Sequence, residues 1–143
     1  MKFLLAVDGS SYTVKAVEYV ISRLDMFRDK PELHVLHVKL PIPTSEARAA
    51  AILGPGTVDN YYRTEAQEAL APAEAILKKK NIPYTASYCI GDIAEQINAY
   101  VKEHQIDMII MGTHGHGALK SLVMGSVATK VLAITSVPVL LVR

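Results

Sequence analysis

Short apolar runs alternate with segments of helical periodicity along the chain, and this alternation constrains the fold more than any other feature. The runs are continuous rather than alternating, which is typical of strands buried on both faces of a sheet. They span residues 3–7, 33–38, 83–89, 108–111 and 139–142. Because strands and helices take turns, the sequence predicts an α/β fold: a doubly wound parallel sheet with helices on both faces and right-handed crossovers.

Several residues predict how the helices begin and break. Ser10 is a favoured N-cap before the first helical pattern. Asp92 with Glu95 three residues later predicts a capping box. Pro72 lies inside the long pattern at 59–80 and is expected to kink or split that helix, because proline removes a hydrogen bond. Residues 39–58 are expected to form an irregular insertion with a short helix at 45–53.

Length and composition limit the class of protein. With 143 residues, half of them apolar, residues 1–143 are expected to form a single domain. The net charge is +1 with scattered charges, so no nucleic-acid partner is expected. No apolar run is long enough to span a membrane, which excludes a membrane partner at this stage. Cys89 is the single cysteine, so an intrachain disulfide is excluded and a cytoplasmic location is expected.

A glycine-rich segment follows the fourth apolar run. Gly112, Gly115 and Gly125 have the spacing G-x2-G-x9-G, and Ser126 comes directly after the last glycine. Glycine lets an anion approach the backbone, and the free N–H groups of a following helix N-terminus then meet its charge. The segment therefore predicts a phosphate-binding loop. It lacks the Gly-Lys-Ser/Thr ending of a P-loop and the early G-x-G-x-x-G of dinucleotide-binding folds.

Three other polar residues have more than one interpretation. Asp8 follows the first apolar run, where its carboxylate is either a turn residue beside Gly9 or an acceptor for a ligand hydroxyl. His114 and His116 lie in the glycine segment, where hydrogen bonding to phosphate or simple exposure is favoured over metal binding or catalysis. The sequence predicts no metal-ligating residues and no catalytic residues.

Several motifs together resemble the universal stress protein family, in its ATP-binding branch. The resemblance covers nearly the whole chain, in order. It rests on Ala6-Val7-Asp8-Gly9-Ser10, Leu36-His37-Val38, Gly91-Asp92, Met111-Gly112-Thr113-His114-Gly115, Gly125-Ser126-Val127-Ala128 and Pro138-Val139-Leu140-Leu141-Val142-Arg143. The family resemblance implies a five-stranded parallel sheet in the order 3-2-1-4-5, which places the first and fourth strands side by side. Asp8 and the glycine segment would then face one crevice.

The resemblance also implies an adenine-nucleotide site. Asp8 would face the ribose, and Val38 would meet adenine through its backbone with Val7 beside it. The remaining implied binding residues come from the glycine segment: Met111, Gly112, Gly115, His116, Gly125, Ser126 and Val127. His116 stands where many relatives carry Arg, and a neutral imidazole offers one donor instead of a charged fork. The expected ligand is therefore ATP or AMP, with or without Mg²⁺ or Mn²⁺.

Three functional hypotheses follow. The first is a stress-response regulatory module that binds adenine nucleotide. The second is a slow metal-dependent ATP hydrolase that uses Asp8 or His114, and the third is a dimeric interaction module whose site stays empty. The last strand ends the chain and would lie at the sheet edge, so a homodimer through residues 138–142 is expected.

Overall fold

The computed structural model describes residues 1–117, 121 and 123–143, and it contains the five-stranded parallel sheet that the sequence predicts. The strand order is β3-β2-β1-β4-β5, so β1 lies between β2 and β4. The fold and its strand order are thereby confirmed. The strands are β1 (Lys2–Ala6), β2 (Glu32–Lys39), β3 (Thr85–Ile90), β4 (Met108–Gly112) and β5 (Val139–Val142).

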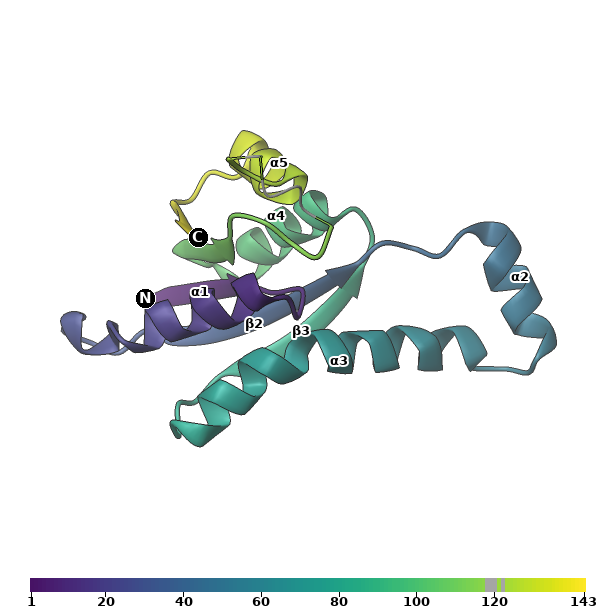
Figure 1. Cartoon of the computed structure of the whole chain (residues 1–143), viewed down its shortest axis with the longest axis horizontal. Coiled ribbons are helices and arrows are strands. Elements are labelled where there is room, and N and C mark those ends of the chain that lie inside the picture. The colour runs from purple at the N-terminus through teal and green to yellow at the C-terminus, as the bar shows by residue number, and fades with distance from the viewer. Residues whose placement is uncertain (118–120, 122) are drawn as a thin grey trace.

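Helices cover both faces of this sheet (Figure 1). The elements are α1 (Ser11–Ile21), the short 3₁₀ helix η1 (Leu24–Met26), α2 (Thr44–Ile52), α3 (Thr57–Lys79), α4 (Ile93–His104) and α5 (Ser126–Ile134). Alternate residues of β1 pack into two separate hydrophobic cores, one on each face of the sheet, since neighbouring strand residues point to opposite faces. Phe3 and Leu5 pack with α1 and α3, whereas Leu4 packs with α4 and α5. The continuous apolar runs in the sequence therefore reflect burial on both sides.

Two of the expected helix features differ in the structure. Pro72 does not divide α3, whose buried stripe continues on both sides of it, with Leu70 before and Ala73 after. Packing of that stripe outweighs the one hydrogen bond that proline removes. Ser10 occupies the N-cap position of α1, but its hydroxyl makes no capping bond. Its Oγ is buried without a partner among the described residues.

The capping prediction at α4 is confirmed on the Asp92 side. The N–H of Glu95 donates to Asp92 Oδ1 over 3.0 Å, which satisfies one of the unpaired donors at the helix N-terminus. Cys89 packs against the core beneath α4. Burial, with Glu103 nearby, raises the pKa of the Cys89 thiol above its ordinary value. The thiol therefore stays protonated near neutral pH, as suits a packing residue.

Residues 40–56, which we call the arm, project from the sheet with the start of α3 (Figure 1). The short helix expected there is α2, and none of its residues is buried. The arm is tied to α3 by a hydrogen bond from the N–H of Ile42 to the hydroxyl of Tyr62, 2.9 Å long. At the base of the arm, Lys39 Nζ lies 3.0 Å from Glu65 Oε2. Across the described part of the chain, no helix is both long and apolar enough to cross a membrane.

Candidate functional site

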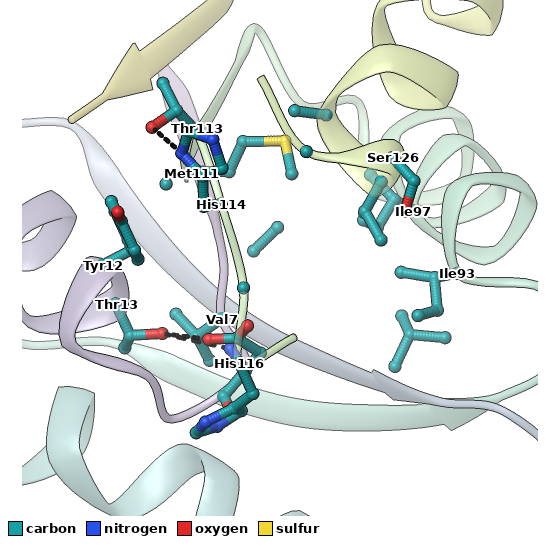
Figure 2. A pocket seen from close by; sticks show the side chains of 18 of the residues that line it. Val7, Tyr12, Thr13, Ile93, Ile97, Met111, Thr113, His114, His116 and Ser126 are labelled. Atoms are coloured by element: carbon teal, nitrogen blue, oxygen red, sulfur yellow. Dashed lines mark hydrogen bonds between the residues drawn. The ribbon is translucent and has the colours of Figure 1, made fainter. Parts of the chain in front are cut away.

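A cavity of about 450 Å³ opens beyond the carboxyl ends of β1 and β4, where the strand order reverses (Figure 2). Its lining includes every residue that the sequence assigned to nucleotide binding. These are Val7, Asp8, Val38, Met111, Gly112, Gly115, His116, Gly125, Ser126 and Val127. The adjacency of β1 and β4 brings these residues together from segments more than a hundred positions apart. Their role in binding stays a prediction.

One wall of the cavity is apolar. β2 contributes Leu36 and Val38, and the first turn of α4 contributes Ile93 and Ile97. Met111 adds its side chain from the end of β4. An apolar wall of this kind suits an apolar ring system better than a charged group, because it offers burial without hydrogen bonds.

A second part of the lining comes from residues 112–117 and 125–128, which are described parts of the glycine segment and the start of α5. The N–H of Gly125 donates to the carbonyl of Thr113 over 2.7 Å, so the end of the segment lies beside its beginning. α5 then starts at Ser126, so its first N–H groups have no partner within the helix. Such groups form a ready anion-binding site. The cavity thus carries an apolar wall and an anion-binding wall.

Asp8 lines the same cavity from the turn between β1 and α1. Its Oδ1 accepts the N–H of Ser10 over 2.9 Å and the hydroxyl of Thr13 over 3.1 Å. The turn before α1 is therefore stabilised by the Asp8 side chain. One carboxylate oxygen of Asp8 builds the turn, as one interpretation expected, and the residue also lines the cavity. Its role as an acceptor for a ligand hydroxyl stays a prediction.

The glycine segment and the Asp8 turn touch each other. A Cβ added to Gly115 would meet Asp8 Oδ2 at 2.6 Å, so the carboxylate itself requires glycine at this position. His116 Nε2 lies 2.8 Å from the carbonyl oxygen of Asp8 and donates to it, because a carbonyl can only accept. The sequence had placed His116 among the residues that face phosphate. In this structure its Nε2 is instead occupied by the backbone of Asp8.

His114 contacts protein groups at the other end of the cavity. Its Nδ1 lies 2.9 Å from the hydroxyl of Thr113 (Figure 2), and its ring centroid is 5.3 Å from that of Tyr12. Among the described residues, no group of three or more His, Cys, Asp or Glu side chains is placed to hold a metal ion.

Sequence reasoning missed several residues that line the cavity. Ile93 and Ile97 are one helical turn apart at the start of α4, and this spacing after a strand could have indicated a cavity wall. Tyr12 and Thr13 carried no signal, because their neighbours fit an ordinary amphipathic helix. The side chain of Tyr12 also explains Gly112, where an added Cβ would lie 2.5 Å from the Cβ of Tyr12.

With the fold and cavity described, comparison with known proteins identifies the class. The family model described as "Universal stress protein family" matches residues 1–143, and the chain belongs to this family. Among curated relatives, universal stress protein YxiE of Bacillus subtilis is 29% identical over 147 residues, covering 99% of this chain and 98% of the relative.

Solved structures give the same architecture. Hypothetical protein MJ0577 aligns with a TM-score of 0.78 at 25% identity, covering 99% of this chain and 94% of the other. The universal stress protein of Archaeoglobus fulgidus, solved in complex with dAMP, aligns with a TM-score of 0.70 at 19% identity and covers 100% and 98% of the two chains. Further structures of this fold contain AMP or cAMP. Structural relatives therefore bind adenine nucleotides.

Proposed function

We propose that this chain binds ATP or AMP in the cavity beyond the carboxyl ends of β1 and β4 and acts as a stress-response regulatory module in the cytoplasm. The observation that carries the proposal is the pairing of two unlike walls in one cavity. The apolar wall of β2 and α4 suits a purine base, and the glycine segment with the start of α5 suits phosphate. Asp8 lines the same cavity and would face the ribose of a bound nucleotide.

The first test is to denature purified protein and identify what is released, followed by calorimetric titration with ATP, ADP and AMP. We expect an adenine nucleotide to be released or, from protein stripped of it, saturable binding of at least one of the three. Release of nothing, together with no measurable heat for any of them, would contradict the proposal. That result would favour the interaction module with an empty site.

The same purified protein separates a regulator from a slow ATP hydrolase. A steady-state turnover assay with Mg²⁺ or Mn²⁺ measures phosphate release from ATP. We expect binding without sustained turnover. Turnover that disappears in Asp8→Asn or in His114→Gln would instead assign the hydrolase function to the cavity.

We further propose a homodimer through residues 138–142. β5 is an edge strand whose four residues are all half-exposed. The carbonyls of Pro138 and Val142 accept bonds from β4, so the alternating backbone groups of Val139 and Leu141 face the free edge. An uncovered apolar edge pairs readily with a second chain, and a two-fold axis would bring the same strand from each copy together.

Leu141→Pro tests this edge with little effect on the sheet, because proline is tolerated on an edge strand where its N–H would face outward. We expect the wild type to be a dimer and the folded variant to be a monomer by light scattering at micromolar concentration. Leu140→Lys and Leu141→Lys probe the two faces of β5 separately. A monomeric wild type, or dimers in all the folded variants, would contradict this mode of association.

A further inference from the structure

We infer that Thr13 is a positioning residue: it holds the Asp8 carboxylate in one orientation, with one oxygen bound to the turn and the other directed to the cavity, and so makes the site selective for nucleotides that carry a ribose hydroxyl. This inference rests on the proposed function. Thr13 is the third residue of α1 and only 3% exposed, and Figure 2 shows its side chain with a hydrogen bond drawn from the hydroxyl.

The hydroxyl of Thr13 uses its entire hydrogen-bonding capacity on this turn. It accepts the N–H of Asp8 over 3.1 Å and the N–H of Gly9 over 3.2 Å. It donates its own proton to Asp8 Oδ1 over 3.1 Å. A hydroxyl has one proton to donate and two lone pairs with which to accept, so no capacity is left for a ligand. Thr13 therefore acts through Asp8 and not by touching the nucleotide.

These bonds make the two oxygens of Asp8 unequal. Oδ1 accepts from both Ser10 and Thr13, whereas the structure contains no hydrogen bond from a described residue to Oδ2. Oδ2 is left as the acceptor that a ligand can reach. An ionised carboxylate can only accept, so Oδ2 favours a hydroxyl and repels phosphate oxygens.

The other side of Asp8 is fixed as well. Gly115 stands so close to Oδ2 that even a methyl group would meet it at 2.6 Å, and His116 holds the Asp8 carbonyl over 2.8 Å. Rotation of the carboxylate would break the bonds to Oδ1. Because the acceptor is already fixed, a ligand that hydrogen-bonds to it loses little free energy to ordering it. A ligand that lacks the hydroxyl leaves the acceptor unpaired, and this weakens its binding. The arrangement therefore discriminates between nucleotides by their ribose hydroxyls.

The experiment measures dissociation constants for AMP, 2′-deoxy-AMP and 3′-deoxy-AMP by calorimetry. The larger of the two ratios of deoxy to ribo dissociation constants is the hydroxyl factor. A hydrogen bond to a charged acceptor predicts a wild-type factor of about tenfold or more. Thr13→Val keeps the branched shape but removes the hydroxyl, and we expect the factor to fall below about twofold. Thr13→Ser restores the hydroxyl and should restore the factor.

A purely structural role for Thr13 predicts a different result. In that case Thr13→Val weakens all three ligands equally and leaves the hydroxyl factor unchanged, which would overturn the inference. Loss of the factor in folded Thr13→Ser would also overturn it. In an Asp8→Ala background, Thr13→Val should change the factor no further, because the oxygen that it orients is gone. If Thr13→Val does not fold, Thr13→Ala repeats the measurement with a smaller side chain.

Nucleotide binding and the positioning role of Thr13 can each fail alone, and the results distinguish the two cases. If wild-type protein binds none of the nucleotides, the proposed function fails. If the wild type binds AMP without discriminating against either deoxy form, or if folded Thr13→Val discriminates as well as the wild type, the positioning role of Thr13 fails while nucleotide binding stands.

Discussion

Glycines near the cavity and glycines in the arm serve different physical purposes. At Gly112 and Gly115 a Cβ would approach the Asp8 turn or α1 to 2.6 Å or less, and at Gly125 it would lie 3.1 Å from a backbone oxygen. At Gly54 and Gly56 of the arm, a Cβ would meet no described residue within 4 Å, and both glycines have positive φ. Glycine lets two segments touch in one region and lets the chain reverse in the other.

The contrast shows why the two regions carry unequal information in the sequence. Close approach links positions far apart in the chain, so a substitution at Gly115 disturbs Asp8 on another element. A turn glycine concerns only its own backbone. The arm has no buried residue in α2, and its apolar residues Ile52 and Leu53 are 85% and 80% exposed. Substitutions at the cavity should therefore affect residues on other elements, whereas substitutions in the arm should affect only the arm itself.

The largest expected effect is on nucleotide binding. Gly125→Val should weaken binding on the order of a hundredfold, because the side chain would crowd Thr113 and the N-terminus of α5, where phosphate approaches. Gly54→Val is the matched control in the arm and should leave the affinity unchanged. Calorimetry measures both. An unchanged affinity in folded Gly125→Val would remove the glycine segment from the site.

A second prediction concerns stability within the cavity region itself. Gly112→Ala should lower the free energy of unfolding by about 1–3 kcal/mol, because the new methyl group would lie 2.5 Å from Tyr12 Cβ. Gly117→Ala should change it by less than about 0.5 kcal/mol, since no atom of the described residues lies within 4 Å of the added Cβ. Urea unfolding of both variants tests this. Equal effects would mean that crowding does not distinguish these glycines.

The sequence predicts the sheet well because burial on both faces leaves a direct signature. The continuous apolar run at Phe3 to Val7 marks β1, although the observed strand is Lys2–Ala6. Strand order came from the family resemblance, because spacing along a chain does not reveal which strands are neighbours. The uninterrupted α3 could not be foreseen at Pro72, since tertiary packing overrides the local preference.

Within the candidate site, the sequence allowed prediction only of residues that interrupt an apolar or helical pattern with a glycine or a charged side chain. Asp8 and the glycine spacing stand out in the sequence, and the structure places them around one cavity. Thr13 does not stand out, because a threonine in the first turn of a helix is ordinary. Its three hydrogen bonds appear only in three dimensions. The partner of His116 was equally hidden, since the Asp8 carbonyl lies 108 positions away.

A third prediction probes how the arm is held. Tyr62→Phe removes the acceptor for the N–H of Ile42, and leaving that group unpaired should cost about 1 kcal/mol. The loss should appear as faster proteolytic cleavage within residues 40–56, with nucleotide affinity unchanged. Tyr61→Phe is the matched control, because Tyr61 is 41% exposed. A drop in nucleotide affinity in Tyr62→Phe would show that the arm and the cavity are coupled.

The smallest expected effect lies at the base of the arm. The hydrogen bond to Glu65 raises the pKa of Lys39 above its ordinary value of 10.5, outweighing the effect of burial. Both side chains are partly exposed, so Glu65→Gln should cost no more than about 0.5 kcal/mol at neutral pH.

The pH dependence of that small effect has a definite sign. A raised pKa in the folded state means that the stabilisation is complete below the unfolded pKa of lysine and is lost as the pH rises through the folded value. Urea unfolding of wild type and Glu65→Gln should therefore give a constant difference from pH 7 to about pH 9, which shrinks only in strongly alkaline solution. Glu68→Gln, an exposed change on the same helix, should show no such trend. A difference that disappears already between pH 7 and about pH 9 would exclude Lys39 as the titrating partner, because lysine remains charged there.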